Sequence, residues 1–155
     1  MSIGSESRVS AVIPVPPPQA FRLLEDPSSF RDLVAGARKI RRFDSRWPEV
    51  GTRLHHTVGV PPLLVRDHTE VVAVDMPNLL VLDALIRPLG CLRVEFRFEP
   101  HPEGTKITVR ERPESGPLSR PLLRTVALAA LQLRNREICR RFRKLARQRS
   151  RAVGT

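Results

Sequence analysis

Residues 91–149 read CLRVEFRFEPHPEGTKITVRERPESGPLSRPLLRTVALAALQLRNREICRRFRKLARQR, and their pattern changes once. Apolar and polar residues alternate over 91–99 and again over 105–112, which is the period of a strand with one buried face. Ser115-Gly116-Pro117 ends this alternation, and a helix without glycine is predicted over 119–149. At the α-helical rise, such a helix of about 30 residues is about 45 Å long. The combination predicts an antiparallel sheet covered by one long C-terminal helix.

The residues before this stretch predict the rest of the domain. Residues 8–15 alternate and are rich in β-branched side chains, so they predict a strand. Two short helices follow, separated where Asp26 can cap the second one and Pro27 suits its first turn. Four further strands are predicted at 37–44, 52–60, 63–74 and 79–87.

The predicted order is therefore β-α-α-β-β-β-β-β-β-α, an α+β fold. A curved antiparallel sheet of about seven strands is expected to wrap around the C-terminal helix. Residues 1–155 are interpreted as a single domain, with 1–7 and 150–155 as flexible tails.

Composition excludes several classes of protein. The chain has 155 residues, of which 41% are hydrophobic, so one buried core is available and disorder is disfavoured. Cys91 and Cys139 lack metal-ligand spacing, and two reduced, packed thiols are expected. No metal and no cofactor is predicted. The first residues contain no apolar signal segment, and no apolar run reaches the ~20 residues that cross a bilayer, so a cytoplasmic location is expected.

The positive charge is concentrated in one element. The net charge is +11, and residues 118–155 hold eleven cations against the single acid Glu137. On a helical wheel the arginines collect opposite an apolar stripe that contains Leu131, Asn135, Ile138, Phe142 and Leu145. Weak contact between this basic face and anionic surfaces is therefore predicted. Specific nucleic-acid binding is not, because only 5% of residues are aromatic and tyrosine is absent.

The first half of the long helix, 122–133, is apolar nearly all round. It should be covered on more than one side or should form a dimer contact. Both a monomer and a homodimer are compatible with this pattern.

Four segments carry a resemblance to a known family. They are PVPPPQAFRLLEDPSSFRDLV (14–34), RWPEVGTRLHHTVGV (46–60), RDHTEVVAVDMPNLLVLDA (66–84) and GTKITVRERPESGP (104–117). With the long helix that follows, they resemble the polyketide cyclase/dehydrase branch of the START-like (SRPBCC) superfamily. The resemblance implies a helix-grip (START-like) fold with a cavity between the sheet and the C-terminal helix. The superfamily includes carriers, sensors, cyclases and aromatases, so it implies no single activity.

Strand alternation selects the side chains that would face such a cavity. Glu111 shares the inward parity of Ile107 and Val109, and His56 lies between two inward residues of its strand. Residues 63–74 fit either parity. One places Leu64, Val72 and Val74 inside together with Arg66, His68 and Glu70; the other places Leu63, Val65, Asp67, Thr69, Val71 and Ala73 inside. The candidate ligand-binding residues are His56, Arg66, His68, Glu70, Leu82, Ala84, Phe96, Glu111, Leu131 and Asn135.

Three functions are compatible with these residues. The first is the binding of a small hydrophobic or amphipathic molecule, whose polar end the inward polar side chains would orient. The second is a cyclase/dehydratase-type enzyme, in which His56, His68 and Glu111 would be the candidates for general acid–base catalysis. The third is an interaction protein that uses the basic helix.

Overall fold

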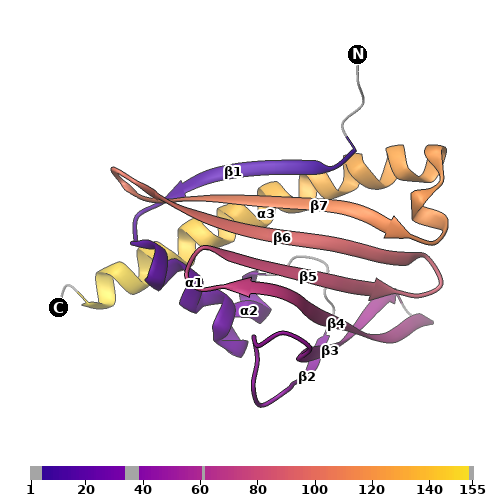
Figure 1. Cartoon of the computed structure of the whole chain (residues 1–155), viewed down its shortest axis with the longest axis horizontal. Coiled ribbons are helices and arrows are strands. Elements are labelled where there is room, and N and C mark those ends of the chain that lie inside the picture. Colours follow the sequence, from indigo (N-terminus) through magenta and orange to yellow (C-terminus); the bar gives the residue numbers. More distant parts are fainter. Residues whose placement is uncertain (1–4, 34–38, 61, 154–155) are drawn as a thin grey trace.

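The computed structural model describes residues 5–33, 39–60 and 62–153 and contains the predicted order of elements (Figure 1). The helices are α1 (Pro17–Glu25), α2 (Pro27–Leu33) and α3 (Pro121–Val153), and a short 3-10 turn, η1 (Pro117–Ser119), precedes α3. The strands are β1 (Ser7–Ile13), β2 (Lys39–Phe43), β3 (Arg53–Val60), β4 (Leu63–Asp75), β5 (Leu79–Ile86), β6 (Gly90–His101) and β7 (Gly104–Ser115).

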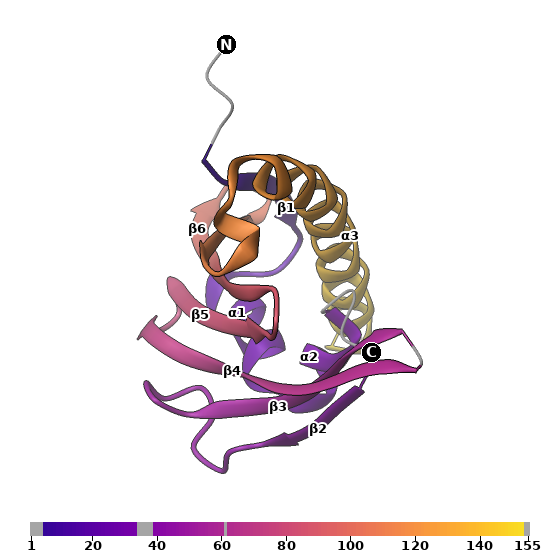
Figure 2. The ribbon, with the colours of Figure 1, turned by 90° about the vertical axis from the view of Figure 1, so that its right-hand side faces the viewer.

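All seven strands form one antiparallel sheet in the order β1-β7-β6-β5-β4-β3-β2. Strands from β2 to β7 each pair with their neighbour in the chain, whereas β1 pairs with the last strand. The helices α1 and α2 carry the chain from one edge of the sheet to the other. Figure 2 shows the sheet curling around a concave side, which α3 faces. The predicted helix-grip architecture is confirmed.

Two glycines allow the connection between β7 and α3 to lie against the β5–β6 turn. Gly116 has a φ of +79°, and a Cβ added there would lie 2.6 Å from the Cα of Gly90. Any side chain at this position would displace backbone, which explains the abrupt end of the strand pattern before α3.

Aromatic side chains fill the interior between the sheet and α3. Phe142 is wholly buried, and its ring centroid lies 6.2 Å from those of Phe96 and Phe98. Phe21 brings α1 into the same cluster, 5.6 Å from Phe98. On α3 the predicted stripe is confirmed, because Leu131, Asn135, Ile138 and Phe142 are buried and Leu145 is half-buried.

The thiols of Cys91 and Cys139 are free and buried, as predicted. Burial raises the pKa of each thiol to about 11. Both therefore remain protonated and unreactive at neutral pH.

Two expectations about the ends of the chain need correction. Ser7, expected in a flexible tail, begins β1 and is buried, because it pairs with Glu111 of β7 on the inner face of the sheet. The helix α3 likewise continues to Val153 instead of ending near residue 149.

The described residues leave one side of the first half of α3 uncovered. Leu122, Val126 and Leu133 are 79%, 63% and 67% exposed, since η1 and β1 contact only one side of this part of the helix. A dimer contact there stays a prediction. No helix in the described ranges combines the length and the apolar character needed to cross a membrane.

Candidate functional site

Glu111 is the most deeply buried acidic side chain on the concave face. It follows Ile107 and Val109 along β7, and all three are 0% exposed, which confirms the predicted parity. Its Oε1 accepts a hydrogen bond of 2.6 Å from Nη1 of Arg134 on α3, which is partly exposed. Burial raises the pKa of Glu111, although the charge and hydrogen bond of Arg134 oppose this change.

A second polar group lies beside this ion pair. Ser7 on β1 is the register partner of Glu111 on β7, so the two side chains share the inner face. Ser7 donates to Oε1 of Gln132 at 2.8 Å and accepts from Nδ2 of Asn135 at 3.1 Å. Asn135 is also 0% exposed. Glu111, Arg134, Ser7 and Asn135, here called the Glu111 patch, therefore join β1, β7 and α3.

His56 forms another polar group on the opposite side of the concave face. Its Nε2 lies 3.1 Å from the hydroxyl of Thr69, and Asp67 is its register partner on β4. The buried carboxylate of Asp67 accepts hydrogen bonds from the backbone and side chain of Arg87. Burial opposes ionisation of Asp67, but these bonds and one from the backbone of His68 outweigh it, so the pKa of Asp67 is lowered.

In the described part of the chain, three buried side-chain atoms have no hydrogen-bond partner. They are Nδ1 of His56, Oε2 of Glu111 and Oδ1 of Asn135. Buried polar atoms are nearly always satisfied, because leaving one unpaired costs about 1–3 kcal/mol. All three belong to residues that the sequence placed in the site. Their unpaired atoms are positions at which a bound molecule or water can complete the hydrogen bonding.

Apolar side chains separate these two polar groups. Between β7 and β4, the sheet positions level with Glu111 are Val94 on β6 and Leu82 on β5, and both are buried. Phe96 and Leu131 are also buried. Ala84 and Ile86 share the inward parity of Leu82, yet they are only half-buried. Solvent therefore reaches the concave face near that end of β5.

Of the two parities left open for residues 63–74, the one that places Arg66, His68 and Glu70 in the interior is wrong. Asp67, Thr69 and Val71 occupy the inner face of β4 instead. The reason is a bulge between Val71 and Ala73, which shifts the register against β5. Val71 and Val74 can then both pack on the core, although they differ in parity.

The side chains of Arg66, His68 and Glu70 lie outside the interior. Arg66 is exposed. His68 lies beside His55, with their ring centroids 6.3 Å apart, and Glu70 accepts a 2.8 Å hydrogen bond from Arg53. The expected convergence of His56, His68, Glu70 and Glu111 is therefore replaced by two separate groups.

Sequence reasoning missed Arg134 and Ser7. Arg134 lies three residues after Leu131 and four before Ile138, so helical spacing alone could have placed it at the border of the buried stripe. No local pattern indicated Ser7, because its burial depends on the pairing of the first strand with the last.

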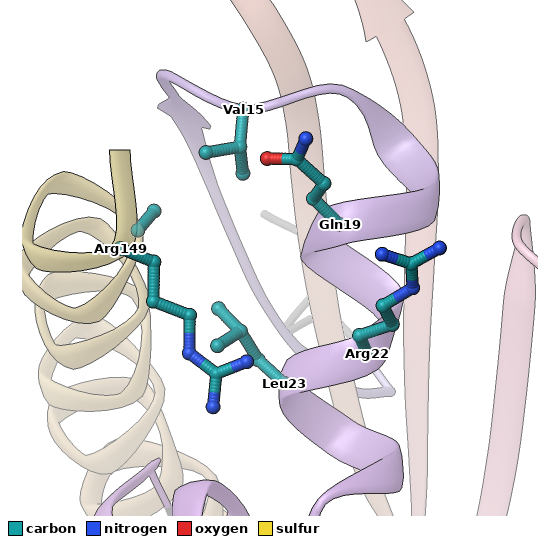
Figure 3. Close-up of a pocket in the computed structure, with 6 residues that line it drawn as sticks. Val15, Gln19, Arg22, Leu23 and Arg149 are labelled. Atoms are coloured by element: carbon teal, nitrogen blue, oxygen red, sulfur yellow. The ribbon is translucent and has the colours of Figure 1, made fainter. Parts of the chain in front are cut away.

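A hollow of about 180 Å³ lies at the other end of α3, between that helix and α1 (Figure 3). It is lined by Val15, Gln19, Arg22, Leu23, Ala146 and Arg149. The Arg149 side chain extends toward α1 in Figure 3 and donates hydrogen bonds to Asp26 and Ser29. This hollow contains none of the predicted site residues.

His56 should make the folded protein sensitive to acid. Burial lowers the pKa of His56 below its ordinary 6.5. As the pH falls through that value, the unfolded chain binds a proton that the folded protein resists, so His56 contributes a loss of stability. We expect the His56→Gln variant to lose less unfolding free energy than the original protein between about pH 7.5 and about pH 5.5. Urea unfolding at both pH values measures this, and equal losses would contradict it.

Comparison with known proteins identifies related sequences and folds. A family model described as polyketide cyclase / dehydrase and lipid transport matches residues 6–147. The comparison with curated proteins gives no match.

Solved structures resemble the fold over nearly the whole chain. Protein MLL2253 from Mesorhizobium loti is 19% identical with a TM-score of 0.71, covering 92% of this chain and 97% of its own. Protein TTHA0849 from Thermus thermophilus is 20% identical with a TM-score of 0.67, covering 94% and 99%. The di-domain ARO/CYC StfQ from the steffimycin biosynthetic pathway is 14% identical with a TM-score of 0.73, covering 94% of this chain and 51% of StfQ.

Proposed function

We propose that this chain, which belongs to the polyketide cyclase / dehydrase and lipid transport family, binds a small hydrophobic or amphipathic molecule between its sheet and α3. The observation that carries the proposal is the set of unpartnered buried atoms on His56, Glu111 and Asn135. Apolar side chains lie between these atoms on the concave face, and a few polar groups on an apolar surface are typical of ligand sites.

The arrangement supports an elongated ligand with a polar end at the Glu111 patch. Its apolar part would lie over Leu82, Phe96 and Leu131, which are buried beside that patch. It would enter near Ala84, where the inner face is only half-buried. His56 and Thr69, on the far side of the apolar region, offer a second point for a hydrogen bond.

One observation favours catalysis as a second candidate function. Burial raises the pKa of Glu111, which makes its carboxyl a better proton donor near neutral pH. A cyclase/dehydratase-type enzyme would use this proton on a hydroxy-carbonyl substrate, with His56 as the neutral base. Turnover would then be lost in Glu111→Gln even where the substrate still binds.

A bulky side chain on the inner face tests ligand binding directly. We expect Ala84→Trp to weaken binding of a neutral hydrophobic fluorescent dye, 1-aminoanthracene, by at least about tenfold, because the indole fills the proposed entrance. Leu85→Trp is the matched control, since Leu85 is the next residue of β5 and has the outward parity. Dye titration measures both affinities. Equal affinities in the two variants would place the dye elsewhere and contradict the proposal.

The basic face of α3 supports only weak contact with anionic surfaces. Arg140 and Arg141 form ion pairs with Glu137, and Arg149 forms one with Asp26, so part of the charge is already compensated. Binding to anionic vesicles should therefore be weak and should fade between low and moderate salt.

A further inference from the structure

The hydrogen bonds beside Glu111 form a series in which Asn135 donates to Ser7, Ser7 to Gln132, and Gln132 to Arg8. This series determines which side-chain atom of Asn135 has no partner. The side-chain amide of Gln132 donates to the backbone carbonyl of Arg8, and its Oε1 accepts from the hydroxyl of Ser7. Ser7 has a single hydroxyl proton, so its oxygen must accept the bond from Asn135. The amide nitrogen of Asn135 therefore faces Ser7, and its unpartnered Oδ1 is a hydrogen-bond acceptor.

Glu111 supplies a second unpartnered oxygen in the same patch. Its Oε1 is taken by Arg134, while Oε2 has no partner. Ser7 is the register partner of Glu111 and the hydrogen-bond partner of Asn135, so the two free oxygens flank the same residue. When ionised, a carboxylate only accepts hydrogen bonds. The patch then presents two acceptors to the interior.

We infer that the polar end of the ligand is a neutral hydroxyl, of an alcohol or a phenol, and that carboxylate and phosphate head groups are rejected. This inference rests on the proposed function, since it names the chemistry of the ligand that would occupy that site. A hydroxyl donates to Asn135 or to Glu111, whereas an anionic head group donates to neither. The oxygens of an anionic head group would face the two acceptors and be repelled by them.

The inference holds for both protonation states of Glu111. If Glu111 carries a proton, the patch offers one donor and one acceptor, which a hydroxyl matches by accepting and donating at once. A carboxylate would match the donor but would still face Oδ1 of Asn135.

Arg134 does not make the patch suitable for an anion. Its guanidinium already contacts Glu111 at 2.6 Å, so the carboxylate of this chain compensates its charge. A second carboxylate would bring two negative charges to one cation in a buried place, which raises the cost of desolvation.

Ligands that differ only in their head group test the inference. Decanol, decanoate and decyl methyl ether have similar apolar chains, but only decanol donates a hydrogen bond at neutral pH. We expect the full chain to bind decanol at least about tenfold more tightly than either of the others, because an unpaired buried acceptor is costly. Displacement of the neutral dye 1-aminoanthracene measures the three affinities.

The variant Glu111→Gln reverses part of the pattern. The amide oxygen of the new side chain must accept from Arg134, so its amide nitrogen, a donor, replaces Oε2. The preference for decanol over decanoate should then shrink by at least about fivefold. Glu99→Gln, at an exposed position of β6, is the control and should keep the original preference. Circular dichroism verifies that both variants fold, and the three-ligand comparison on the unmodified chain is decisive without them.

The outcomes separate this inference from the function on which it rests. Decanoate binding as tightly as decanol would overturn the inference and would assign Arg134 to an anionic head group. Equal binding of the ether and decanol would also overturn it, because the patch would then make no use of a donor. If none of the three displaces the dye from the original chain, the proposed function fails, and the inference fails with it.

Discussion

Replacing Phe142 by alanine should lower the free energy of unfolding by about 3–5 kcal/mol. Phe142 is 0% exposed and is the residue through which α3 contacts the aromatic rings of β6. Its removal takes away apolar burial and leaves a space that Phe96 and Phe98 can only partly fill. Denaturant unfolding at neutral pH, with the slope checked against that of the unmodified protein, measures the loss.

A surface position on the same helix provides the control. Arg147 lies five residues after Phe142 and is exposed, so Arg147→Ala should change the unfolding free energy by less than about 0.5 kcal/mol. A loss from Arg147→Ala that matches the loss from Phe142→Ala would mean that α3 faces the sheet with a different side.

Regular strands made their inner faces predictable. In the parts of β5, β6 and β7 that hold Leu82, Phe96 and Glu111, inward side chains recur every second residue, so a few clear apolar positions determined their orientation. In β4 a single bulge after Val71 changes the parity, and the bulge itself has no sequence signature such as glycine. The orientation of that strand could therefore not be derived from alternation.

The sequence predicted which residues of the candidate site face inward, but not which of them lie next to one another. Parity identified His56 and Glu111, and helical spacing identified Asn135. Which of them meet depends on strand order, and β4, β5 and β6 stand between His56 and Glu111. The partner of Glu111 was missed because Arg134 is 23 residues away in the sequence and is brought to it only by the packing of α3.

Breaking this ion pair should be as damaging as losing a core aromatic ring. We expect Arg134→Met to lower the free energy of unfolding by about 3–5 kcal/mol at mildly alkaline pH, because it leaves a buried carboxylate without its charged partner. Methionine keeps the apolar stem that arginine places against the sheet, so the change in packing is small. The double variant Arg134→Met with Glu111→Gln should recover most of the loss, since it also removes the charge.

The pH dependence distinguishes this electrostatic effect from altered packing. The pKa of Glu111 is raised on folding, so the folded protein binds its proton at a higher pH than the unfolded chain does. Its burial therefore reduces stability above the folded pKa and has no such effect below the unfolded pKa. Arg134 opposes the rise in the pKa of Glu111. Arg134→Met should therefore raise this pKa further and widen the pH interval, between the unfolded and the folded pKa, over which stability falls. Unfolding measured across the acidic and neutral range should show the variant approaching the unmodified protein as the pH falls, whereas a loss that is the same at every pH would assign Arg134 a packing role alone.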